Sequence, residues 1–471
     1  MKKCLYIFFA LLLLVGCKEH QFSSDPSMRL TFSADSVCFD TVFTGMGSST
    51  QQVMIYNRNA NAVRISRVWL DKGDKFFINV DGENNMDNLR DIEIYGKDSI
   101  FLFVRTQIDP YTTNALPLEI DTIRFLVNGS IQSIGLQAFG MNVHRMKGIV
   151  TDGPLTLKAD SNYLIYDSLV VKGKLTIPAN TTLYMHNKAN IQVYGGIDIQ
   201  GELDRPVTIM GDRLDNLFEH VPYRVASGQW GGLYLIDTTA SGQEWKINYA
   251  EIIGGSTGIY CIGDTVNKTP TAKLSLTNSR IHNHAGYGVV MLYANATIIN
   301  TEISNCASYL LYLGSGQHNV TYTTIAGFFG YPNSNLNIHQ VSRENVPAVL
   351  VDSAARVDIC NSIITGVQKN NLVVADTSLH SFPGKVEYSY LRNDSLVGEG
   401  CQAIIYAGEQ DTVFKNVYYM YKKYKYFDFR LDSVSPARGI GLYIDEDAYR
   451  NDRNGLARKQ EHPDAGCYEW Q

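Results

Sequence analysis

Carboxyl groups are the first residues to consider, because a pair of them can cleave a glycosidic bond. Such a hydrolase needs two carboxyls at a fixed separation, one acting as acid and the other as base or nucleophile. The acids available for this chemistry are scattered along the chain: Asp198, Asp204, Asp212 and Asp237. No HExxH or GxSxG motif is present either. We therefore expect no catalytic residue, with polysaccharide cleavage as the alternative.

Two imidazoles could bind a metal ion. His282 and His284 flank Asn283, and on a strand they would share one face, as two metal ligands require. The sequence shows no third ligand near them. We expect a solvated or stacked pair, and we predict neither a metal nor a cofactor.

A thiol near the N-terminus offers a different chemistry. Lys2 and Lys3 precede an apolar run over residues 5–15, which is too short to span a bilayer. The run ends in Leu14-Val15-Gly16-Cys17, which resembles the lipobox of bacterial lipoproteins. The resemblance implies a signal peptide over residues 1–16, lipidation of Cys17 (with palmitate among the acyl chains) and anchoring to the membrane by that lipid. An ordinary signal peptide followed by a chance cysteine is the alternative.

The residues after Cys17 bear on location. Residues 17–27 are polar and read as a tether, and Lys18-Glu19-His20 partly resembles the signal that sends some Gram-negative lipoproteins to the cell surface. That signal usually has two or more acids, and this chain has one. We expect an outer-membrane lipoprotein facing the cell surface, with inward-facing placement as the alternative. A net charge of −6 gives no support for a nucleic-acid partner.

Residues 28–142 are predicted to form about seven short strands. Ile123-Arg124-Phe125-Leu126-Val127 ends at Asn128-Gly129, a strong hairpin signal. With the run Asp40–Gly45 and the strands Ile55–Asn57 and Phe77–Val80, this segment resembles bacterial immunoglobulin-like domains of the ASH type. Such domains are usually spacers or docking modules.

Residues 150–432 carry an internal repeat. Ile281, Ile303 and Ile325 are each 22 residues apart, and an Asn or Tyr precedes each of them by three positions. A β repeat of this length predicts a solenoid, in which Asn side chains can stack as an amide ladder. With Gly228-Gln229-Trp230-Gly231-Gly232, the segment resembles right-handed parallel β-helix proteins. About ten coils fit between residues 165 and 400, and the alternative is an array of β-sandwiches.

The last segment, residues 433–471, resembles the closing motif of many bacterial β-helix proteins. The matching residues are Ser435-Pro436-Ala437, Asp452-Arg453-Asn454-Gly455, Arg458 and Asp464-Ala465-Gly466-Cys467-Tyr468-Glu469. We interpret Asp452, Arg458, Asp464 and Glu469 as a hydrogen-bonded cap, because an uncovered solenoid end exposes strand edges. The overall fold class is thus all-β: an immunoglobulin-like sandwich followed by a right-handed parallel β-helix.

Two segments are candidates for binding. The next copy of the repeat after Ile325 ends at Ile363, so this spacing is longer than 22 residues. Insertions in solenoids often form loops on one face, and such loops often carry the function. The residues of the loop that we favour for partner contact are Phe328, Phe329, Tyr331, His339 and Arg343. The alternative is that the two phenylalanines fill the interior of a coil.

The second segment is an aromatic and basic strip. Its candidate residues for a glycan or a partner are Tyr418, Tyr421, Lys422 and Tyr424. An edge strand protected by lysines is the alternative. Of the cysteines that follow Cys17, we expect most to be buried single thiols.

Two classes of function fit these features. The first is a non-enzymatic, lipid-anchored scaffold or accessory subunit that binds an outer-membrane protein. The second is a glycan-binding or polysaccharide-degrading protein, because many β-helix proteins are lyases or hydrolases. A flat rod with an apolar patch would favour the first class, and a concave groove lined by acids would favour the second.

Overall fold

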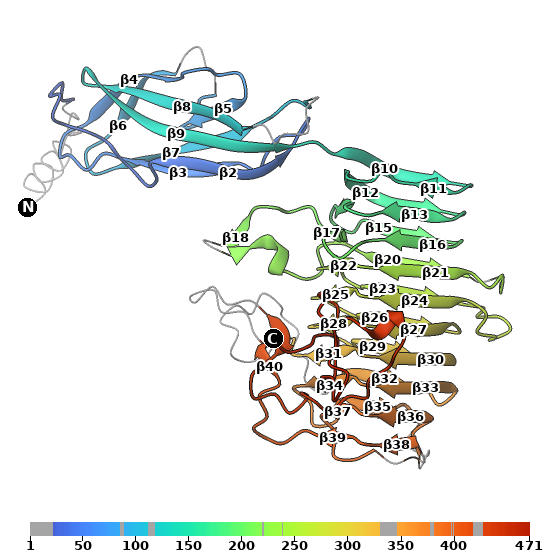
Figure 1. The fold of residues 1–471 in the computed structure, drawn as a ribbon. Coiled ribbons are helices and arrows are strands. Elements are labelled where there is room, and N and C mark those ends of the chain that lie inside the picture. Colours follow the sequence, from blue (N-terminus) through green and yellow to red (C-terminus); the bar gives the residue numbers. More distant parts are fainter. Residues whose placement is uncertain are drawn as a thin grey trace, which may run out of the picture. The chain divides into compact units, whose positions relative to one another are not determined.

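The computed structural model describes residues 22–84, 89–111, 118–218, 221–237, 239–329, 346–376, 381–396, 398, 400–417 and 427–471. The chain divides after Asn142 into two compact units (Figure 1). Within the described ranges there are strands and short 3₁₀ turns but no α-helix. None of these elements is a helix long and apolar enough to cross a bilayer.

The first unit is an immunoglobulin-like sandwich of two sheets around one core. One sheet has the order β1 (Thr31–Phe32), β3 (Gln51–Tyr56), β7 (Ser99–Thr106), β5 (Phe76–Val80). The other has the order β2 (Ser36–Phe43), β9 (Ser130–Met141), β8 (Leu118–Val127), β4 (Val63–Leu70), β6 (Arg90–Ile94). Strands β8 and β9 form the hairpin predicted at Asn128-Gly129, and both turn residues have positive φ, as this turn requires.

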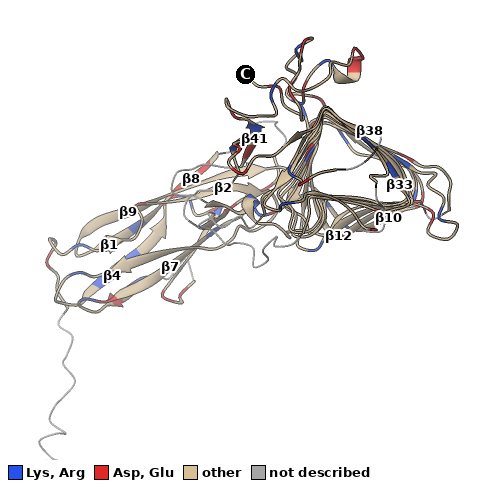
Figure 2. Cartoon of the chain, turned by 90° about the horizontal axis from the view of Figure 1, so that it is seen from below, with Lys and Arg blue, Asp and Glu red and all other residues tan. Residues whose placement is uncertain are grey.

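The second unit is a parallel β-helix with three faces, and its coils superimpose as a triangle in Figure 2. Face I is a ten-stranded sheet, with one strand from each coil, as the estimate of about ten coils predicted. Its strands are β11 (Leu155–Thr156), β13 (Leu175–Pro178), β16 (Ile197–Gln200), β21 (Glu244–Asn248), β24 (Lys273–Thr277), β27 (Asn295–Ile299), β30 (Gly316–Thr321), β33 (Ala355–Cys360), β36 (Gly384–Glu387) and β38 (Gly400–Gln402).

Faces II and III share the strands β10 (His144–Thr151) and β12 (Asn162–Val171), which bend across both. Face II continues with β14 (Thr182–Met185), β17 (Val207–Gly211), β22 (Ala250–Ile253), β25 (Arg280–His282), β28 (Glu302–Ser304), β31 (Thr324–Gly327), β34 (Ile363–Gly366), β37 (Tyr390–Leu391) and β39 (Ile405–Tyr406). Face III continues with β15 (Asn190–Val193), β20 (Gly232–Ile236), β23 (Ile259–Ile262), β26 (Val289–Leu292), β29 (Leu311–Leu313), β32 (Val349–Val351) and β35 (Leu372–Val374). The solenoid strands therefore begin before residue 150 and end well before residue 432, the limits expected from the sequence.

The sequence repeat has a structural meaning at each position. Ile281, Ile303 and Ile325 stack in register inside the solenoid and are 0% exposed. Three residues earlier, Asn278 and Asn300 turn the chain from face I to face II with φ near +50°. Asparagine tolerates this left-handed conformation better than most residues. The repeat thus encodes one turn and one buried contact per coil.

Amide–amide hydrogen bonds form at two corners of the coils. At the corner between faces I and II, Asn278 Nδ2 donates to Asn248 Oδ1 at 2.9 Å. The Asn300 amide hydrogen-bonds the C-terminal segment instead of Asn278. At the next corner, Asn305 Nδ2 donates to Asn283 Oδ1 at 3.0 Å. Both residues again have positive φ.

The lengthened repeat is an insertion and not a skipped coil. Ile325 pairs with Ile364, one residue beyond the predicted Ile363, and β31 and β34 are direct neighbours. The extra residues lie between β31 and β32, where residues 330–345 are outside the described part of the chain.

The C-terminal segment covers a side of the solenoid, and the prediction that it caps the end is wrong in this respect. Asp452, Arg458, Asp464 and Glu469 are buried and hydrogen-bonded, as expected. However, residues 427–471, which we call the C-terminal strap, lie against face II (Figures 1 and 2). The strap includes β41 (Asp428–Leu431), which pairs with β40 (Phe414–Asn416), and the 3₁₀ turn η3 (Asp447–Tyr449).

Outward apolar residues explain this position. On face II, Ala326, Ile363 and Tyr390 point away from the interior and form a second core with Phe429 and Leu431 of the strap. Burying these side chains is favourable at about 25 cal/mol per Å². The strap therefore packs as an additional layer on the outer side of face II.

Candidate functional site

Most residues of the two predicted binding segments lie outside the described residues. Those of the lengthened loop are Tyr331, His339 and Arg343, and those of the strip are Tyr418, Tyr421, Lys422 and Tyr424. Cys17, the predicted lipidation site, also lies outside them. These predictions therefore remain untested.

Phe328 and Phe329 are described, and the first is half-buried while the second is buried. Phe329 is 2% exposed. Phe328 stacks on Phe429, with ring centroids 6.2 Å apart, and meets Phe414 edge-on. Phe328 therefore packs between the solenoid and the strap, against the second core of face II. Contact of this loop with a partner stays a prediction.

The two histidines do not form a metal pair. Asn283 between them has φ +63°, which breaks the strand alternation that would place both rings on one face. His282 packs against Phe427 and Phe429 under the strap. His284 is fully buried, accepts from the Gly255 amide at 3.1 Å and donates to the Ile252 carbonyl. Burial lowers the pKa of His284 to about 4, so it is neutral at pH 7.

Three of the four aspartates considered for hydrolysis have structural partners, and the fourth, Asp204, is exposed. The Asp237 carboxylate is 1% exposed and accepts hydrogen bonds from the amides of residues 241–243, which closes the turn after β20. Asp198 pairs with Lys174 at 2.9 Å on face I, and Asp212 contacts His186. In the described part of the chain, no three His, Cys, Asp or Glu side chains are grouped as a metal site would need.

Glu302 is the centre of a buried ionic cluster under the strap. Its carboxylate accepts from Arg280 at 2.9 Å, from Ser304 at 2.5 Å and from the Tyr468 hydroxyl at 2.6 Å. Burial opposes its charge, but Arg280 and neighbouring groups outweigh burial and hold its pKa at about 2. A carboxylate saturated in this way is a poor acid or base, and it joins the strap to β28.

A shallow pocket of about 470 Å³ opens beside this cluster. It is lined by Arg280, Glu302, Phe427, Asp428, Phe429, Arg430, Asn454 and Tyr468. Arg430 pairs with Asp428 at 2.6 Å, and Arg280 pairs with Glu302. Since the charges that line the pocket neutralise one another, it does not favour an anionic or a cationic ligand.

Face III carries the most unusual surface of the solenoid. Its outward residues stack in register from β20 to β32, and none is charged: Tyr234, Tyr260, Val290, Tyr312 and Leu350. The adjacent outward column on β20, β23 and β26 is also apolar: Ile236, Ile262 and Leu292. We call these eight residues the tyrosine face.

The tyrosine rings lie close to one another along the solenoid. The rings of Tyr234 and Tyr260 have centroids 6.0 Å apart. At the adjoining turns, Tyr287 stacks on Tyr309 at 6.2 Å, and Tyr309 contacts Tyr312 at 6.3 Å. Each ring thus covers part of its neighbour's face. Burial raises the pKa of Tyr260 and of Tyr312, so the hydroxyls remain neutral donors at pH 7.

The sequence analysis missed this face. Its tyrosines stand at irregular spacing along the chain because the turns between successive coils differ in length. The short apolar strands that carry them were visible, but an outward tyrosine and an inward one cannot be separated without the register of the coils.

Comparisons with known proteins identify no family for this chain. No protein-family model matches the chain, and no curated protein sequence matches it. Among solved structures, an ASH/PapD-like domain of human CEP192 (PapD-like domain 7) is similar at 9% identity and a TM-score of 0.18. The match covers 27% of this chain and 96% of that domain.

Proposed function

We propose that this chain is a non-enzymatic lipoprotein of the outer membrane, lipid-anchored at Cys17, whose solenoid binds a protein partner through the tyrosine face. The observation that carries the proposal is the uncharged outward column Tyr234, Tyr260, Val290, Tyr312 and Leu350. In this role the protein is a scaffold or an accessory subunit of a membrane complex facing the cell surface.

The size of the tyrosine face suits the centre of an interface. Five coils at about 4.8 Å each and two outward columns give a patch on the order of 300 Å². A stable interface needs roughly 800 Å² on each partner, with an apolar core and a polar rim. Tyrosine is favoured in such cores because its ring packs while its hydroxyl keeps a hydrogen bond.

The geometry supports a protein partner more than a polysaccharide. Stacking on a sugar requires a free aromatic face, and here neighbouring rings cover part of one another. Three of the acids weighed for sugar cleavage, Asp198, Asp212 and Asp237, have partners in ion pairs or a turn. Polysaccharide binding or cleavage remains the second candidate, and new unsaturated ends formed from a uronic-acid polymer by the purified protein would support it.

The partner experiment compares two faces of one solenoid. Tyr260→Asp with Tyr312→Asp places two charges on the tyrosine face, and Thr297→Asp with Asn319→Asp places two charges on face I. Each protein is purified from its own membranes in mild detergent, crosslinked and analysed by mass spectrometry. We expect the tyrosine-face variant to lose a crosslinked membrane protein that the face I variant retains, while both variants still unfold in a cooperative thermal transition. Retention of that protein by both variants would contradict the proposal.

The anchor is tested separately. Cys17→Ala should remove the lipid and release the protein from the membrane fraction. If the variant still sediments with outer membranes, either the lipobox assignment is wrong or a tight partner holds the protein, and combining it with the tyrosine-face variant separates these two cases.

A further inference from the structure

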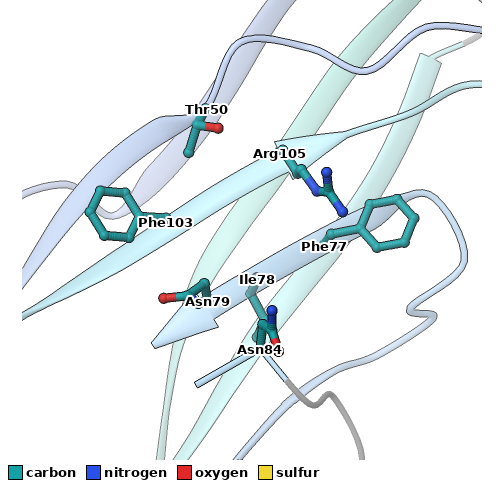
Figure 3. Close-up of a pocket in the computed structure, with 7 residues that line it drawn as sticks. All are labelled: Thr50, Phe77, Ile78, Asn79, Asn84, Phe103 and Arg105. Carbon is teal, nitrogen blue, oxygen red and sulfur yellow. The ribbon is translucent and has the colours of Figure 1, made fainter. Parts of the chain in front are cut away.

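The immunoglobulin-like unit carries a groove that the proposed function does not use. A pocket of about 540 Å³ lies on the outer side of the sheet that contains β5 and β7 (Figure 3). Its described lining residues are Thr50, Phe77, Ile78, Asn79, Asn84, Phe103 and Arg105. The volume is within the range of about 300–1,000 Å³ that is usual for small-molecule sites.

Two phenylalanines flank the groove. Asn79 pairs with Phe103 across β5 and β7, and Phe77 pairs with Arg105. Phe77 and Phe103 point outward and are only half-buried, while the intervening Ile78 is 3% exposed and belongs to the core. The groove therefore presents aromatic surface on a rigid sheet and not on a loop.

Arg105 is the one charged group among the described lining residues of the groove, and Thr50, Asn79 and Asn84 supply both donors and acceptors. The Arg105 guanidinium lies over the Phe77 ring, 5.1 Å from its centroid, and forms no ion pair within the described ranges. Asn79 Oδ1 accepts from the Gly82 amide at 3.1 Å, which turns its Nδ2 group away from that bond. No lining residue among those described is acidic. The groove therefore favours a ligand with an anionic group and hydrogen-bond acceptors.

We propose that this groove binds one ring of a carboxylated saccharide, of the uronic-acid type. The carboxylate would pair with Arg105, since a guanidinium matches a carboxylate in a two-point hydrogen bond. Phe103 stacks on Phe101, with ring centroids 5.8 Å apart, so the C–H face of the sugar would lie on the opposite face of the Phe103 ring. The hydroxyls would meet Asn79, Asn84 and Thr50. The site lies in the other unit from the tyrosine face, so the two proposals stand or fall independently.

The ligand is tested on the full-length protein in detergent. We titrate trigalacturonate, with the neutral galactose trimer as the comparison, and follow binding by calorimetry and by saturation-transfer NMR. Saturable binding of the acidic trimer alone, weakened by added salt, is expected. Arg105→Gln should weaken it roughly tenfold, the scale of one charged hydrogen-bonded pair. Phe103→Leu should also weaken it by removing the stacking surface.

The matched control is Arg64→Gln. Arg64 is also exposed, but it pairs with Glu93 at 2.8 Å on the other sheet, so its loss should leave binding unchanged. Equal binding of the neutral trimer, equal losses in the two arginine variants, or no saturable binding would overturn the proposal. So would preferential binding of an acidic aromatic peptide in place of the saccharide. The variant Tyr260→Asp with Tyr312→Asp should keep full affinity, so failure of the partner proposal would not affect this one.

Discussion

Faces I and III of the solenoid both point apolar side chains inward, but their outward side chains differ in polarity. The outward column of face I is polar or charged at each coil from β16 to β33: Asp198, Lys246, Ser275, Thr297, Asn319 and Asp358. The corresponding column of face III is tyrosine and aliphatic. In Figure 2 the edge at β33 and β38 carries blue and red segments, while the edge at β10 and β12 is mostly tan. The fold therefore does not require apolar residues on its outer surface.

On face II, outward apolar residues are covered by another part of the chain. Ala326, Ile363 and Tyr390 are buried because the C-terminal strap covers them. On the tyrosine face, the tyrosines of the main column are half-buried, Val290 among them is 3% exposed, and Tyr287 at the margin is 37% exposed. We infer that the tyrosine face is the counterpart of face II, with its cover supplied by a partner.

The largest effect is expected where the strap meets face II. Arg458 is 4% exposed, donates to Asn300 at 2.9 Å and pairs with Glu469 at 3.3 Å. Arg458→Met should destabilise the unit by about 3–5 kcal/mol, because breaking a buried ion pair leaves the other charge without compensation. Urea unfolding measures the loss, and limited proteolysis should then cleave the strap first. A variant with unchanged stability would show that the strap is not an integral layer.

The inner ladder should respond almost as strongly. Ile303→Ala removes a fully buried side chain stacked between Ile281 and Ile325 and should cost about 2–5 kcal/mol. The control variant is Thr297→Ala on the outer side of face I, which should change the free energy of unfolding by less than about 0.5 kcal/mol. Similar losses for both variants, measured in urea, would contradict the division between inside and outside.

As the pH falls, the solenoid should lose stability through His284 before the carboxylate of Glu302 in the ionic cluster is protonated. The pKa of His284 is about 4 when folded, below its ordinary value of 6.5, so the unfolded chain binds a proton that the folded chain does not. Stability from this group is complete above pH 6.5 and is lost down to pH 4, by about 3 kcal/mol in total. Glu302 has a folded pKa of about 2, so the stability that its ionised carboxylate contributes is lost only as the pH falls below about 4.5. NMR titration of His284 checks this order, and a midpoint near pH 6.5 would refute it.

The smallest expected change in stability among the main predictions comes from replacing tyrosines on the outer side of face III. Tyr260→Ser with Tyr312→Ser should lower the free energy of unfolding by no more than about 1 kcal/mol per site, because both rings lie outside the core. Calorimetry of the purified protein measures this. A loss as large as that of Ile303→Ala would mean that the tyrosines serve the fold, and the partner proposal would lose its main support.

Local patterns in the sequence predicted much of the fold. The 22-residue spacing located the inner isoleucines, since each coil returns a residue to the same inward position. The turn chemistry of Asn128-Gly129 located the β8–β9 hairpin, because few other residues accept positive φ. Both features depend on residues close in sequence, for which propensity and periodicity are sufficient.

Only the tertiary structure decided which surfaces are covered. Nothing in the closing motif indicated that Tyr468 and Arg458 reach back to Glu302 and Asn300, because those contacts join residues more than 150 positions apart. The positive φ of Asn283 separated two histidines that alternation would have paired. The register of coils joined by unequal turns assembled the tyrosine face from strands that look alike in the sequence. Which side of a strand faces inward is local information, but what lies against its outer side depends on chain segments far away in the sequence.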